Sequence, residues 1–324
     1  MFTRKKALVA SLILLIFLYV GTLGSLTRYA AYPKWYRPAQ TVNFKSSDLS
    51  LPPCSSYQKT TYVFCDDPKV NLGLDFQEVS FEEEVNHKTI GFAGWYIPVT
   101  APAKPKALII LVHGAGADRR AMLKHAPYLH KAGYALLVMD THNHGLAFND
   151  GRGISFGLKE SLSIGLVPHW MEKTSIKLPI IGFGTSQGAF SVLYTASLGL
   201  PLHAIIAENP YFSVKRVLTE VPLLTVIPSF FKTQSITLLS FWLGGDLFEL
   251  DGDLFLKKIQ QPVLFIHGEN DDFVPHIHSQ DMIAKISSKQ KELWLVPYGY
   301  HEKLWNLNPS EYEKRVLEFL DKCL

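Results

Sequence analysis

The chain has 324 residues, of which 47% are hydrophobic, and its formal net charge at pH 7 is +3. This is ample apolar material for a large core, at a length that an α/β fold still reaches as one domain. The low net charge and the scattered lysines and arginines argue against a surface for nucleic acid, so no nucleic-acid partner is expected.

The N-terminus has the pattern of a membrane anchor. A basic cluster at residues 4–6 precedes an uncharged, largely apolar stretch at 7–27, which is long enough to cross a bilayer as a helix. We therefore predict that residues 1–27 form an uncleaved anchor through which the protein associates with a membrane. The alternative is a cleaved signal peptide, for which the small residues at 21–25 would supply the cleavage site.

Residues 28–76 are rich in proline, show little periodicity and are predicted to be a juxtamembrane segment. Basic residues soon after the apolar stretch offset the N-terminal cluster, so the positive-inside rule does not decide the orientation. A disulfide between Cys54 and Cys65 would put the following domain outside the cytosol and leave Cys323 unpaired. We predict a single-pass protein with an extracytoplasmic domain; three free thiols facing the cytosol are the alternative.

The fold class is predicted from the order of apolar runs after Gln77. Residues 81–85 and 89–99 indicate two strands of an antiparallel hairpin at a sheet edge. Strands and helices then alternate, which is typical of a parallel sheet with right-handed crossovers. We predict an α/β domain at 77–324, with a mostly parallel central sheet, helices on both faces and a small helical cap.

An oxyanion-binding loop is predicted after the first strand of the parallel region. The apolar run 107–112 has the character of a strand that is buried on both faces. It ends in His-Gly-Ala-Gly at 113–116, where backbone N–H groups could face a developing negative charge. The predicted donors are the N–H groups of Ala115 and Gln187, whereas His113 is expected to be structural.

The most informative motif is G-x-S-x-G at 184–188. It follows an apolar run at 178–183 and precedes a run with helical spacing at 189–198. A strand, a tight turn and a helix in this order present the serine hydroxyl at the tip of a strained turn. Ser186 is therefore the predicted nucleophile. A dinucleotide site is disfavoured, because Gln187 occupies the sixth position of the overlapping G-x-G-x-x-G pattern.

A cap is predicted in the insertion at about 211–260, which contains no clear strand. Residues 221–231 and 236–243 are strongly apolar, as expected for helices that cover a site and shape an apolar pocket. Contact with a membrane surface or simple core packing are the alternatives. Tyr211 and Phe212, just past a strand end, are predicted to line the substrate pocket.

An acid is predicted in the loop after the strand at 262–266. Asp271 and Asp272 compete for this role on position alone, and the alternative is a solvated acidic turn. A carboxylate placed there can orient a histidine and stabilise its protonated form.

His301 follows the last strand, at 293–297, and is the predicted base. His276 and His278 are its rivals, but they lie close behind the acidic loop, where the next helix is expected. The chain order serine, aspartate, histidine is one of the known orders of the triad and differs from those of chymotrypsin and subtilisin.

Over residues 77–324 the chain resembles the α/β-hydrolases. The resemblance rests on H-G-A-G at 113–116, G-T-S-Q-G at 184–188, H-G-E-N-D-D-F-V-P at 267–275 and the final Tyr300-His301. Within that superfamily it looks like membrane-anchored bacterial serine hydrolases near the S9-type peptidase and esterase branch. The resemblance implies that Asp271, rather than Asp272, is the acid.

The predicted function is therefore that of a serine hydrolase that cleaves a carboxylic ester of a small molecule through Ser186, Asp271 and His301. A peptidase or a thioesterase on the same residues is an alternative, since the fold does not set the substrate. A non-catalytic, membrane-anchored binding protein is the alternative from another class. No cofactor is expected, and no metal, because the histidines lack an H-E-x-x-H pattern.

Overall fold

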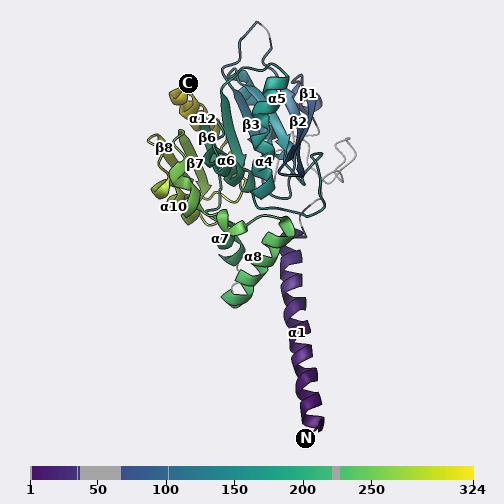
Figure 1. Cartoon of the computed structure of the whole chain (residues 1–324). Coiled ribbons are helices and arrows are strands. Elements are labelled where there is room, and N and C mark those ends of the chain that lie inside the picture. The colour runs from purple at the N-terminus through teal and green to yellow at the C-terminus, as the bar shows by residue number, and fades with distance from the viewer. Residues whose placement is uncertain (1, 35, 37–66, 101, 221–226) are drawn as a thin grey trace.

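The computed structural model describes all residues except 1, 35, 37–66, 101 and 221–226. Its centre is an eight-stranded sheet in the order β1-β2-β4-β3-β5-β6-β7-β8 (Figure 1). The strands are β1 (Gln77–Val85), β2 (Lys88–Ile97), β3 (Leu108–Val112), β4 (Ala135–Asp140), β5 (Ile180–Thr185), β6 (Leu202–Glu208), β7 (Val263–Gly268) and β8 (Lys291–Val296).

The sheet is antiparallel only at one edge. β1 pairs with β2, and β2 with β4, in antiparallel register, while all pairs from β4 to β8 are parallel. All five residues of β3 are buried, as expected for a strand with helices on both faces. The predicted α/β-hydrolase fold, with its antiparallel hairpin, is confirmed.

Two helical layers cover the sheet. Leu108 and Ile110 belong to one core cluster, and Ile109 and Leu111 to the other, because successive side chains of a strand point to opposite faces. The first face is covered by α4 (Leu158–Gly165), α5 (Val167–Lys173), α6 (Gln187–Ser197) and α10 (Ile277–Lys285), and the second by η1 (Arg119–His125), α3 (Ala126–Lys131), α11 (Leu304–Leu307) and α12 (Pro309–Cys323).

The region predicted as a cap is helical where the structure describes it. It contains α7 (Val214–Glu220), α8 (Ser229–Leu243), η3 (Leu247–Glu249), α9 (Gly252–Phe255) and η4 (Leu256–Lys258). Residues 221–226, within the predicted apolar run 221–231, lie outside the described residues. Ile236, Leu239 and Leu243 of α8 are buried, while Phe241 on its outer face is 85% exposed.

The first helix, α1 (Phe2–Ala31), projects from the body beside α8 (Figure 1). It continues past the predicted boundary at residue 27, and its last residue is part of the core: Ala31 is buried, and its carbonyl accepts a 3.0 Å hydrogen bond from Ile154 N–H. Beyond the helix, the hydroxyl of Tyr36 donates to the carbonyl of Asn143 at 2.7 Å. The start of the predicted juxtamembrane segment is thus packed onto the domain, and α2 (Pro68–Leu72) forms near its end.

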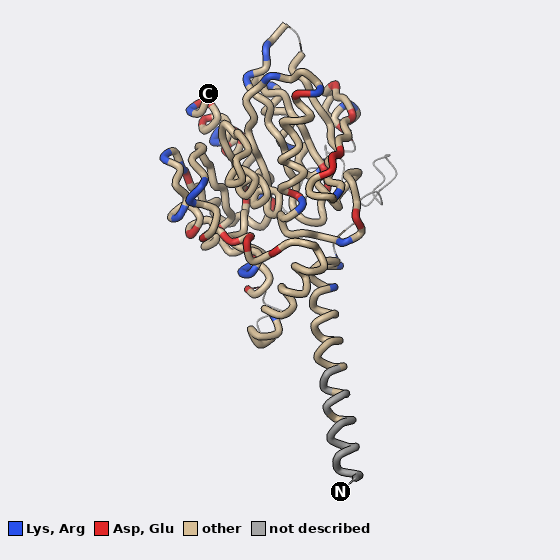
Figure 2. Tube along the Cα trace, viewed as in Figure 1, with Lys and Arg blue, Asp and Glu red and all other residues tan. Residues whose placement is uncertain are grey.

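Within the described part of the chain, no helix combines the length and apolar character needed to cross a membrane. Many side chains of the predicted anchor at 7–27 lie outside the described set, so the anchor stays a prediction, as does the extracytoplasmic location. Cys54 and Cys65 also lie outside the described residues, and Cys323 is a free, partly buried thiol. Charged residues are dispersed over the body, whereas α8 has almost none (Figure 2).

Candidate active site

Ser186 lies at a sharp turn between β5 and α6. Its φ is +51°, a strained value for a residue other than glycine, and its N–H donates to Glu208 O at 2.7 Å. The flanking glycines make the turn possible: a Cβ on Gly184 would lie 2.4 Å from the carbonyl carbon and oxygen of Gly188, and one on Gly188 would lie 2.4 Å from two backbone oxygens of the β3 end. Only glycine allows the strand and helix to approach this closely.

The structure brings together the three residues predicted to form the triad. Ser186 Oγ lies 2.9 Å from His301 Nε2, and His301 Nδ1 lies 2.6 Å from Asp271 Oδ2. The residues follow β5, β8 and β7, whose carboxyl ends share one edge of the sheet. Both distances are within hydrogen-bond reach, which is the arrangement that general-base activation of a hydroxyl requires.

The alternative candidates for the acid and the base that the sequence offered are not part of this hydrogen-bonded series. Asp272 is exposed. His276 is the residue before α10, and His278 lies within that helix, where its Nε2 contacts Glu220 Oε2 at 2.9 Å. His113 is buried, with its Nδ1 2.8 Å from the carbonyl of Gly114.

Asp271 is held by several hydrogen bonds besides that of His301. Its Oδ1 accepts the N–H groups of Phe273 and Val274 at 3.0 and 2.7 Å, and Asn209 Nδ2 donates to its Oδ2 at 2.6 Å. Burial raises the pKa of the Asp271 carboxyl, but hydrogen bonds from His267, His301 and the Val274 N–H outweigh it and hold that pKa below its usual range. Asp271 is therefore the charged member of the site.

Asn209 also reaches the loop that carries His301. It is fully buried at the end of β6, and its Oδ1 accepts the Glu302 N–H at 3.3 Å. One amide thereby links the acid to the residue after the histidine. No sequence motif points to this role; its place directly after a buried strand, at the same sheet edge as Ser186, is the signal that could have found it.

The pKa of His301 reflects opposing effects. Burial lowers the pKa of this imidazole, but the hydrogen bond and charge of Asp271, with the charges of Glu302 and Glu208, raise it above its ordinary value of 6.5. The surrounding carboxylates thus favour the imidazolium, the form in which a histidine base holds the proton of an attacking hydroxyl.

Ala115 and Gln187, predicted as oxyanion donors, line the same cavity as Ser186. Gln187 is the first residue of α6, where the helix leaves its N–H groups without intrahelical partners. Among the described hydrogen bonds, neither backbone N–H has an acceptor. This is the state that donors reserved for a substrate oxygen should have.

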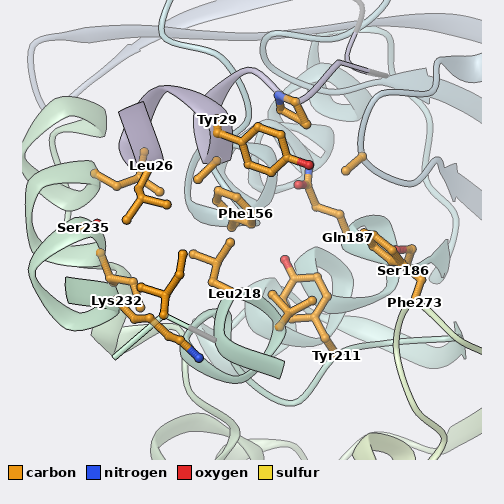
Figure 3. A pocket seen from close by; sticks show the side chains of 17 residues that line it. Leu26, Tyr29, Phe156, Ser186, Gln187, Tyr211, Leu218, Lys232, Ser235 and Phe273 are labelled. Carbon is orange, nitrogen blue, oxygen red and sulfur yellow. The ribbon is translucent and has the colours of Figure 1, made fainter. Parts of the chain in front are cut away.

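A cavity of about 140 Å³ opens beside Ser186 (Figure 3). Its walls come from α1, α7, α8 and the loops around Ser186, and most lining side chains are apolar. Tyr211 lines it as predicted. Phe212 does not: the cations of Arg216 and Lys285 lie over its ring, 5.3 and 5.1 Å from its centroid. Both residues lie just after β6, but only Tyr211 reaches the cavity.

In the described part of the chain, no group of three or more His, Cys, Asp and Glu side chains is placed to hold a metal ion.

Comparisons with known proteins find similar sequences and a similar fold. The family model described as serine aminopeptidase, S33, matches residues 255–308. The chain is 26% identical to the uncharacterised protein YqkD of Bacillus subtilis, over 68% of this chain and 73% of that one. It is also 26% identical to human protein ABHD12B, over 86% and 76% of the two chains.

Solved structures share the fold. The esterase Pf2001 of Pyrococcus furiosus superposes with a TM-score of 0.63 at 19% identity, over 89% of this chain and 99% of that one. An acylaminoacyl peptidase of Pyrococcus horikoshii has a TM-score of 0.56 at 16% identity, over 77% of this chain and 42% of the peptidase. The fold is therefore shared by enzymes named for ester and for peptide substrates.

Proposed function

We propose that the chain is a serine hydrolase of the α/β-hydrolase superfamily and that it cleaves carboxylic esters. The observation that carries the proposal is the hydrogen-bonded series Ser186–His301–Asp271 at the end of an apolar cavity. Such a series activates a serine hydroxyl that is otherwise a weak nucleophile.

The reaction begins when Ser186 Oγ attacks the ester carbonyl and His301 Nε2 accepts its proton. The N–H groups of Ala115 and Gln187 stabilise the resulting oxyanion. The intermediate then expels the alcohol, to which His301 returns the proton. Water, deprotonated by His301, attacks the acyl-enzyme and releases the acid and Ser186. Asp271 orients the imidazole throughout and stabilises its charged form.

The cavity supports an ester in preference to a peptide substrate. Lys232 is the only charged residue among the described residues that line the cavity, and its amine donates to the carbonyl of Thr219 at 3.1 Å. An aminopeptidase would need a carboxylate in this cavity for the substrate's free amino group, and the described residues that line it include none. Asp272 and Glu302 line a separate pocket that shares Ser186.

The test is hydrolysis of three substrate types by the full chain: p-nitrophenyl esters, an acyl thioester and an aminoacyl anilide. We expect ester turnover to be fastest and to fall by at least about 10⁴-fold in Ser186→Ala, because the nucleophile is lost. Faster cleavage of the anilide would reassign the protein to the peptidases. Equal ester turnover in wild type and variant would contradict the proposal.

A further inference from the structure

One wall of the cavity beside Ser186 is built from the N-terminal helix. Leu26, Tyr29 and Ala30 line it at the i, i+3, i+4 spacing of a single helix face. Pro33, just past the end of the helix, lines it as well. Figure 3 shows Leu26 and Tyr29 among the side chains that line the cavity, with the Tyr29 hydroxyl toward the Gln187 and Ser186 end. The end of α1 is fixed in place by the buried Ala31, so the wall is a built part of the domain.

A second wall is formed by α8, whose lining residues recur at the i, i+3, i+4, i+7 spacing of one helix face. Lys232, Ser235, Ile236 and Leu239 line the cavity. The two helices also contact each other directly: the rings of Tyr19 and Phe231 lie 5.8 Å apart, and Thr27 Oγ1 donates to Ser235 O at 3.5 Å. Two helix faces therefore enclose a space that ends at the nucleophile.

The space suits an apolar chain. Apart from the Lys232 stem, whose amine is turned to Thr219 O, the two helix faces contribute mainly aliphatic and aromatic surface. Polar atoms gather at the Ser186 end, where the buried Tyr211 hydroxyl has no hydrogen-bond partner among the described residues. A buried hydroxyl without a partner requires an explanation, and the polar part of a bound ester, held at the nucleophile, supplies one.

We propose that the faces of α1 and α8 together form the acyl-binding site, and that the substrate is an ester with an apolar acyl chain. This rests on the proposed function, since the chain is placed by its carbonyl at Ser186. It gives α1 a role in specificity: the helix that the sequence marks as an anchor also selects the acyl chain. Removal of α1 would therefore remove part of the site.

The test uses the full chain in detergent and a series of p-nitrophenyl esters from acetate to dodecanoate. For wild type we expect kcat/KM to rise by up to about fourfold for each methylene added, until the cavity is filled. In Ala30→Trp the indole fills the cavity, so the ratio of dodecanoate to acetate turnover should fall at least tenfold from its value in wild type.

Gly24→Trp is the matched control on α1. Residue 24 lies about 120° around the helix from Ala30, and no atom lies within 4 Å of the position of its Cβ. Its profile should equal that of wild type. Leu26→Ala is a second variant with the opposite effect, since a larger cavity should shift the optimum to longer esters.

Chain-length profiles that coincide in wild type, Ala30→Trp and Leu26→Ala would overturn the inference, even with ester turnover intact. Absence of acetate hydrolysis by wild type would instead contradict the proposed function. If Ala30→Trp also loses acetate turnover through misfolding, the shift in Leu26→Ala decides, because a truncation of this partly exposed side chain leaves the fold in place.

Discussion

Asp271→Asn is expected to lower kcat for ester hydrolysis by about 10⁴-fold, the loss typical of this substitution in serine triads. Asp271 Oδ2 accepts from His301 Nδ1 at 2.6 Å. An asparagine amide can present an N–H group there, which would favour the tautomer with its proton on Nε2. In that tautomer the imidazole cannot accept the proton of Ser186. Steady-state kinetics on an activated ester measures the effect.

Asp272→Asn is the matched control for this prediction. It removes the same charge one residue along the loop, from an exposed side chain, and should leave kcat within about twofold of wild type. A smaller than tenfold loss in Asp271→Asn, or an equal loss in the two variants, would contradict the role given to Asp271.

Gly188→Ala is expected to destabilise the fold by about 3 kcal/mol or more, at the upper end for an overpacked position. The new Cβ would lie 2.4 Å from the carbonyl oxygens of Val112 and His113. Both belong to the backbone at the end of β3, which is paired with β4 and β5 and cannot withdraw. Urea denaturation of the full chain in detergent would measure the loss.

Gly165→Ala provides the comparison, because it adds the same methyl group at the end of α4 with no atom within 4 Å. It should be neutral or slightly stabilising, since alanine loses less backbone entropy than glycine on folding. A Gly188→Ala protein as stable as Gly165→Ala would show that the turn at Ser186 is less tightly packed than the structure indicates.

The sheet and the three central site residues could be predicted from sequence because the signals are local. β3, β5 and β7 appear as short, continuous apolar runs, and Ser186 and Asp271 come soon after two of them. Parallel strands bring their carboxyl ends to one edge, so residues that are distant in sequence meet there.

Other parts of the site depend on contacts that no local pattern encodes. Asn209 is a single amide with no motif, and its role comes from lying between Asp271 and the Glu302 N–H. The faces of α1 and α8 meet across more than two hundred residues of sequence, and the apolar character of α1 indicates an anchor equally well. Tyr211 and Phe212 are adjacent aromatic residues just after a strand, so the sequence does not show which of them lines the cavity. In the structure only Tyr211 does.

The claim that Ser186 is an activated nucleophile can be tested most directly by covalent labelling. The full chain in detergent would be treated with a fluorophosphonate probe, and the intact mass and modified peptide determined for wild type and Ser186→Ala. The account predicts one adduct per chain, on Ser186, and none in the variant. An unlabelled wild type that is folded, or equal labelling of the two proteins, would contradict it.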